Sequence, residues 1–140
     1  MLWKRLYNTV WLASFSFLAI PHIFGRHLAV AIIHAAFGIA MLVMARMNAN
    51  EVSKMAVPDR IKRISKGVVM TTTLLAVLGV VLGALKHISG VPELAANIVA
   101  GFHVFIALAV LSQSSSLATA FDMWEEKEIA PSQPTPPAAS

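Results

Sequence analysis

Apolar residues are gathered into four long stretches, which short polar segments separate. Each stretch is close to the ~20 residues that a helix needs to cross the hydrocarbon core of a membrane. A chain in lipid must satisfy its own backbone polar groups, so stretches of this kind predict helices. We therefore predict an all-α fold, an integral membrane four-helix bundle of up-down-up-down topology. The predicted helices cover residues 6–24, 28–45, 68–85 and 94–121.

These helices form one predicted domain over residues 1–128. Residues 129–140 hold four of the seven prolines and are too rich in proline to pack, so we expect a disordered tail. The connection between the second and third helices, about 47–67, mixes acidic and basic residues. We interpret it as a cytoplasmic connector held at anionic headgroups, with a short surface helix near 59–66. A docking surface for a partner subunit is the alternative.

Composition supports the membrane interpretation, since 57% of the 140 residues are hydrophobic and 13% are charged, which argues against a soluble globular domain. The absence of cysteine excludes disulfides, thiolate metal sites, iron–sulfur clusters and covalent c-type haem attachment. A cofactor would have to be held by histidine, methionine, carboxylates or backbone groups. The net charge of +4 would suggest nucleic acid in a soluble protein. Here we expect no nucleic-acid partner, because the distribution of the basic residues indicates how the chain is oriented in the membrane.

The distribution of basic residues predicts the orientation of the chain. With four spans, both termini and the middle connection share one side, and that side carries Lys4, Arg5, Arg46, Lys54, Arg60, Lys62, Arg63, Lys66 and Lys127. The other side has only Arg26 and Lys86. Positive residues mark the cytoplasmic face, so we expect both termini inside, in a bacterial inner (cytoplasmic) membrane. An interfacial aromatic belt at the inner ends would consist of Trp3, Tyr7, Trp11 and Trp124.

A short motif recurs at the outer ends of the first and third helices. The first copy is His22-Ile23-Phe24-Gly25, and the second is His87-Ile88-Ser89-Gly90. Each copy precedes a short outer connection and a helix with a further histidine, His34 in one half and His103 in the other. This pattern predicts a duplicated helical hairpin with an approximate twofold axis along the membrane normal.

The two inner histidines are predicted to lie at equal depth. His34 is about seven residues and His103 about nine residues inside its helix, which at ~1.5 Å per residue places each roughly 10–14 Å below the outer surface. Their helices run parallel and are diagonal neighbours in an up-down-up-down bundle. Two imidazoles that face each other across the interior can be the axial ligands of one haem. Separate (bacterio)chlorophyll-type ligation and structural hydrogen bonding are the alternatives.

Other polar residues supply further candidates. His22 and His87 could ligate a second haem, bond propionates or a quinone, or simply contact interfacial water. Propionates could also pair with Arg26, His27 and Lys86. The Gly-x-x-x-Gly at 79–83 is interpreted as helix packing that also makes room for a ring. The hydroxyls at 71–73 and the polar run at 112–116 are interpreted as helix contacts, with a polar pocket for a quinone head or substrate as the alternative.

Two histidine motifs resemble those of small four-helix membrane b-type cytochromes. They are His34 with the downstream Gly38, and His103 within Ala100-Gly101-Phe102-His103. The architecture over residues 6–121 is similar to the cytochrome b561-like group, to the membrane anchors of succinate dehydrogenase and to one half of haem A synthase. The resemblance implies that His34 and His103 are axial ligands of haem b. No acidic residue lies beside these histidines, which argues against the haem modification that haem A synthase would imply.

The resulting expectation is a haem b iron centre in an electron-transfer subunit of a larger respiratory or photosynthetic membrane complex. Bis-imidazole ligation leaves the iron no open position, so electron exchange with quinone or a partner subunit is expected, and no residue is assigned as catalytic. The alternative is a cofactor-free accessory subunit whose histidines make hydrogen bonds. A transporter is a weaker possibility, because the spans carry no acidic or basic residue at mid-membrane to bind a charged substrate.

Overall fold

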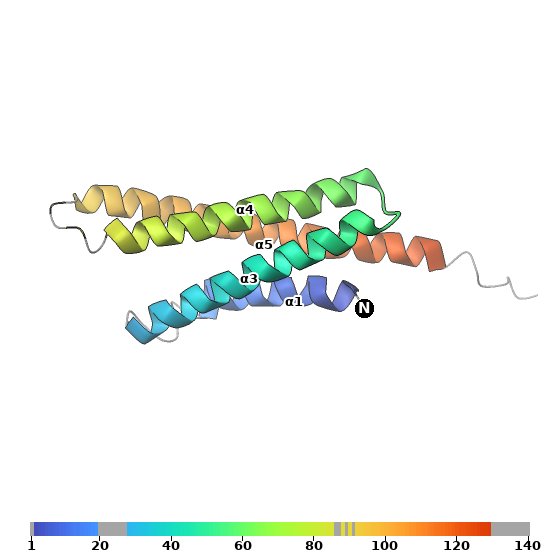
Figure 1. Cartoon of the computed structure of the whole chain (residues 1–140), viewed down its shortest axis with the longest axis horizontal. Helices are drawn as coiled ribbons and strands as arrows, with labels where there is room; N and C mark the ends of the chain where they lie inside the picture. Colours follow the sequence, from blue (N-terminus) through green and yellow to red (C-terminus); the bar gives the residue numbers. More distant parts are fainter. Residues whose placement is uncertain (1, 20–27, 86–87, 89, 91, 130–140) are drawn as a thin grey trace, which may run out of the picture.

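The computed structural model describes residues 2–19, 28–85, 88, 90 and 92–129. Within these residues every regular element is helical, which confirms the all-α prediction (Figure 1). The elements are α1 (Leu2–Ser14), a π-helical turn η1 (Phe15–Ala19) that continues it, α3 (Leu28–Lys54), α4 (Asp59–Leu85) and α5 (Glu93–Ile129).

The helices form a four-membered bundle in which each one packs against two neighbours. α1 lies against α3 and α5, and α4 lies against the same two helices from the other side. The N-terminal end, the α3–α4 connection and the C-terminal end of α5 point toward one end of the bundle (Figure 1). The topology is therefore up-down-up-down, with α3 and α5 on one diagonal and α1 and α4 on the other.

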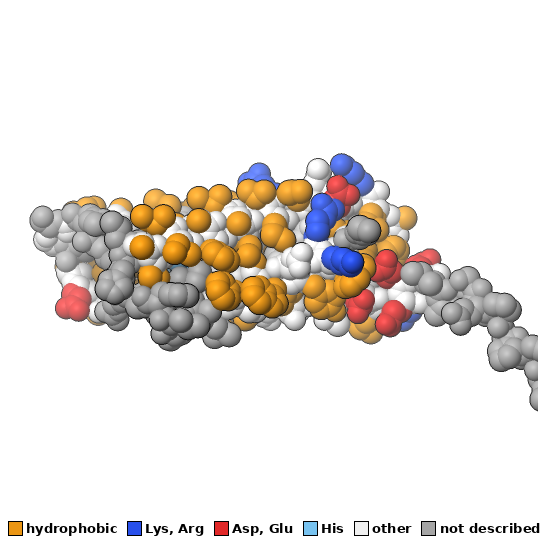
Figure 2. Space-filling model, turned by 90° about the horizontal axis from the view of Figure 1, so that it is seen from below, with side chains coloured by type: hydrophobic (Ala, Val, Ile, Leu, Met, Phe, Trp, Pro, Cys, Tyr) orange, Lys and Arg blue, Asp and Glu red, His pale blue; other side chains and the backbone are white. Residues whose placement is uncertain are grey.

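Three of the described helices are long and apolar enough, by length and composition, to cross a membrane. They are Ala29–Lys54, Asp59–Leu85 and Glu93–Glu128, with mean hydropathies of 2.0 to 2.4. The first predicted span is described only to Ala19, and its residues 20–24 lie outside the described part of the chain. Figure 2 shows hydrophobic side chains along the middle of the bundle. The protein is a membrane-embedded, multi-pass protein whose apolar helices contact lipid.

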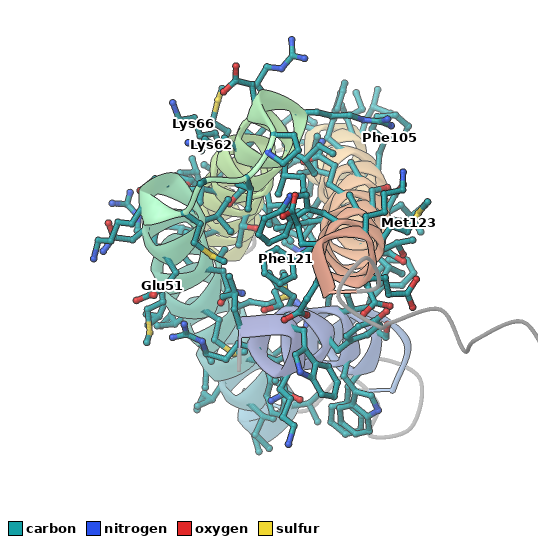
Figure 3. All side chains as sticks on the ribbon, turned by 90° about the vertical axis from the view of Figure 1, so that its right-hand side faces the viewer. Glu51, Lys62, Lys66, Phe105, Phe121 and Met123 are labelled. Carbon is teal, nitrogen blue, oxygen red and sulfur yellow. The ribbon has the colours of Figure 1, made fainter. Side chains whose placement is uncertain are left out.

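The interior is a seam of residues that recur every three or four positions along each helix. It consists of Leu6, Thr9, Ala13 and Ser16, of Met41, Ala45, Asn48 and Val52, of Ile61, Ser65, Val68 and Thr72, and of Val110, Ser114, Leu117 and Phe121. Spacing of this kind is typical of helices that pack with coiled-coil-like geometry around a central core. Viewed along the bundle, Phe121 points into the core, whereas Phe105 and Met123 point outward (Figure 3).

The predicted connector at 47–67 is wrong in its first part, whereas the helix predicted near 59–66 is present as the beginning of α4 and not as a separate surface helix. α3 continues to Lys54 and α4 begins at Asp59, so only a few residues join them. The chain stays helical because the seam continues here. Val52, Val57 and Ile61 are buried in one cluster with Leu6, Val68 and Phe121. For the same reason α3, α4 and α5 extend beyond the predicted 28–45, 68–85 and 94–121. Hydropathy marks the part of a helix that lies in lipid, and these helices project past it.

The seam can be tested with one substitution at two valines. Val110 is 0% exposed, whereas Val80 is 74% exposed on the lipid face. Truncation in the seam leaves a cavity that the neighbours fill only in part, so we expect Val110→Ala to lower the free energy of unfolding by about 1–3 kcal/mol. Val80→Ala, the matched control, should change it by less than about 0.5 kcal/mol. Thermal unfolding in detergent micelles measures both, and equal losses would contradict this core.

Candidate functional site

His34 and His103, both partly buried, lie next to each other across the bundle. Their ring centroids are 6.1 Å apart, and the ring planes are inclined by 55°. His34 belongs to α3 and His103 to α5, so the pair crosses the diagonal of the bundle. The structure thus brings together the two residues to which the sequence assigned equal depth on parallel helices.

The seam explains why both rings face inward. His34, Met41 and Asn48 follow one another at seven-residue intervals on α3, and His103 precedes Val110 by seven residues on α5. Residues seven positions apart share one face of a helix in a bundle of this kind. Because Met41, Asn48 and Val110 are buried, the histidines one interval away are directed to the same interior.

His34 contacts Ser16, a residue that was not among the predicted site residues. Ser16 Oγ lies 3.4 Å from His34 Nδ1, and Ser16 is buried. Ser16 belongs to the wider turn η1, and single π-helical turns inside helices are frequent at functional sites. When Nδ1 carries the proton it donates to the serine hydroxyl, and Nε2 is left with a free lone pair. In the sequence, Ser16 is one of two serines in an aromatic, apolar run, so nothing there separates it from Ser14.

His103 is positioned by packing against α4, since its Nδ1 makes no hydrogen bond within the described residues. Its Nδ1 is buried and has no hydrogen-bond partner among the described residues. The ring lies against the backbone of Gly79 on α4, where an added Cβ would be 3.3 Å from His103 Cε1. An added Cβ at Gly83 would meet no atom within 4 Å. The two glycines of the Gly-x-x-x-Gly motif therefore have different surroundings, and Gly79 is the one that gives room to a ring, the imidazole of His103.

Below the histidine pair the core changes from polar to apolar and back to polar. Ala13, Met41 and Val110 form a small buried cluster, with Val110 fully enclosed. Toward the end of the bundle that carries the α3–α4 connection follow Thr9, Asn48 and Ser114, all buried. The interior thus contains an outer polar layer around the histidines, an apolar layer, and an inner polar layer.

The hydroxyls at 71–73 make helix contacts. Thr71 Oγ1 lies 3.1 Å from Gln113 Oε1 and joins α4 to α5. Thr72 and Thr73 donate to carbonyls of their own helix. A cavity at the inner polar layer measures about 10 Å³, which is too small for a quinone ring. The structure favours helix contacts over a quinone or substrate pocket at this cavity.

Five predicted site residues lie outside the described part of the chain: His22, Arg26, His27, Lys86 and His87. The second haem site and the propionate contacts assigned to them stay predictions, as does most of the repeated motif. Gly90, in the second copy of the motif, has a φ of +85°, the left-handed conformation that glycine adopts in turns without steric cost.

The described residues contain no group of three or more His, Cys, Asp or Glu side chains placed to hold a metal ion. The pair His34 and His103 offers two nitrogen ligands. Comparisons with protein families, with curated proteins and with solved structures found no match to this chain.

The contact between Gly79 and His103 can be tested through the imidazole itself. Because a methyl group at position 79 would press on Cε1, we expect Gly79→Ala to shift the ring and change the ¹³C and ¹⁵N NMR signals of His103. Gly83→Ala, the matched control on the same helix, should leave them in place. The measurement uses histidine-labelled protein in micelles, and His103 signals that stay unchanged in Gly79→Ala would exclude the contact.

Proposed function

We propose that this protein is a membrane electron-transfer subunit that binds haem b between His34 and His103. The observation that carries the proposal is the separation of the two rings. A histidine nitrogen binds a metal at about 2.0–2.1 Å and lies about 1.1 Å from its ring centre, so two rings in line on opposite sides of one metal have centroids about 6.2–6.4 Å apart. The observed separation of 6.1 Å is close to this range.

The donor set also fits such a group. Each imidazole can give one nitrogen to a metal, and the 55° between the planes is no obstacle because each ring can turn about its own metal–nitrogen axis. When bound, a haem with two axial imidazoles supplies one-electron transfer and keeps no open coordination position.

The surrounding residues would then act on the ligands. Ser16 would fix the orientation and tautomer of His34, as outer hydrogen-bond partners do for metal-bound histidines. Gly79 would let the ring of His103 approach α4. Below the pair, Met41 and Val110 exclude water and keep the local dielectric low, which influences a redox potential.

The wider assignment rests on the sequence. His22 and His87 would belong to a second haem or quinone site near the outer surface, and Arg26, His27 and Lys86 would pair with propionates. Electrons would be exchanged with quinone or with a partner subunit of a larger complex. The proposed home is a bacterial inner membrane with both termini in the cytoplasm, supported by Lys and Arg side chains that gather toward the α3–α4 end of the bundle (Figure 2).

An optical spectrum tests the haem proposal. We expect purified protein to give reduced-minus-oxidised bands of haem b, and His34→Ala and His103→Ala to lose them because each variant removes one axial ligand. Val104→Ala changes the lipid-exposed neighbour of His103 and should keep the bands. Circular dichroism confirms that each variant is folded. A colourless, folded wild-type protein, expressed with haem available, contradicts the proposal.

A second candidate is a cofactor-free accessory subunit in which the histidines are structural. It is favoured by the contacts that both rings already make, His34 with Ser16 and His103 with Gly79. The same spectrum separates the candidates, since this one requires a colourless protein. Bands in the red or near infrared would indicate chlorophyll-type pigment instead.

The proposed orientation can be tested with single cysteines, because the chain has none of its own. Ser53 lies at the α3–α4 end and Glu93 at the opposite end, and both are exposed. In cells with a permeabilised outer membrane, we expect a membrane-impermeant maleimide to label Glu93→Cys at once. Ser53→Cys should react only after the inner membrane is disrupted. The reverse pattern would place the termini outside.

A further inference from the structure

Three polar side chains from three different helices meet at the inner polar layer. They are Thr9 of α1, Asn48 of α3 and Ser114 of α5, each only 2–3% exposed. Asn48 Nδ2 donates to Thr9 Oγ1 over 2.9 Å, and Thr9 Oγ1 donates to the carbonyl oxygen of Arg5 over 2.8 Å. All three residues line the cavity of about 10 Å³, whose other walls are Leu6, Ala45, Val68 and Leu117.

Two polar atoms at this cavity have no hydrogen-bond partner in the described protein. They are Asn48 Oδ1 and Ser114 Oγ, and both are enclosed. A buried polar atom without a partner destabilises the folded protein, because its hydrogen bond to water is lost and not replaced. Lipid cannot supply the missing bonds, so the partner has to lie inside the bundle.

We propose that one water molecule occupies this cavity and bridges α1, α3 and α5. A cavity of about 10–15 Å³ is the smallest that holds a water, and such a water needs two to four polar partners. The donors and acceptors match this count. The Ser114 hydroxyl donates to the water, and the water donates to Asn48 Oδ1 and to the lone pair that Thr9 Oγ1 still has free.

The same residues fit a metal cation less well. A hard cation requires about six oxygen ligands, commonly including carboxylates. This cavity offers three neutral side-chain oxygens, and the amide nitrogen of Asn48 also faces Thr9. The bridging water is independent of the haem proposal, because the apolar layer of Ala13, Met41 and Val110 separates its hydrogen-bond partners from the histidines.

Ser114 and Ser65 provide a matched pair for the test. Both serines are buried, and neither Oγ has a partner among the described residues, but only Ser114 lines the cavity. We expect Ser114→Ala to lower the melting temperature in micelles by roughly 3–5 °C, because the water loses its donor. Ser65→Ala should leave it unchanged or raise it, because no hydrogen bond is lost. Equal shifts in the two variants would overturn the proposal.

Ser114→Thr distinguishes a hydrated cavity from a dry one. The added methyl group fills the space, so it stabilises the protein if the cavity is empty. If a water is present, the methyl group displaces it and leaves Asn48 Oδ1 without a partner, and we expect a fall in melting temperature of several degrees. A rise in the melting temperature of Ser114→Thr therefore overturns the proposal.

The unaltered protein gives a further measurement that needs no folded variant. In lipid bilayers, we expect solid-state NMR to show magnetisation transfer from water to the side-chain amide of Asn48, despite its depth in the bundle. Absence of this transfer would overturn the proposal.

A comparison of salts distinguishes water from a bound cation. The melting temperature is measured at equal concentrations of sodium, potassium and choline chloride. Equal melting temperatures support water, whereas a higher melting temperature in sodium or potassium alone would assign the cavity to that cation.

Discussion

Polar side chains that face the interior of a lipid-embedded bundle must find their partners within the bundle, and this constraint determines how the helices fit together. An apolar side chain gains about as much from contact with a lipid tail as from contact with another helix. Close packing and interhelical hydrogen bonds therefore determine which helix faces meet. The hydrogen bonds from Asn48 to Thr9 and from Thr71 to Gln113 join different helices. The contact between Ser16 and His34 likewise joins the N-terminal helical segment to α3. Large apolar side chains, by contrast, remain exposed over much of the surface.

The fold and the histidine pair could be predicted from sequence because each depends on one strong signal. Long apolar runs separated by polar segments leave few alternatives to membrane helices. The depths of His34 and His103 then follow from residue counts along two parallel helices. Four antiparallel spans with short connections place those helices on a diagonal, which is where the structure has them.

The remaining features depend on contacts that hydropathy does not report. The helical parts of 47–67 are polar in composition, and their helices continue because of buried residues such as Val52 and Ile61. Ser16 is one hydroxyl among many, and it becomes recognisable only when the turn η1 brings it to His34. Asn48 and Ser114 are distinguished from other polar residues by the three- and four-residue spacing of the seam.

The apolar layer of Ala13, Met41 and Val110 has a consequence for the membrane itself. Proton relays through membrane proteins run along chains of ionisable or hydrogen-bonding groups. Along α3, the nearest seam groups of this kind on either side of Met41 are His34 and Asn48, about 21 Å apart by helical rise. The three side chains of the layer offer no donor or acceptor oxygen or nitrogen. Ala13, Met41 and Val110 therefore cannot themselves pass a proton between the polar groups on their two sides.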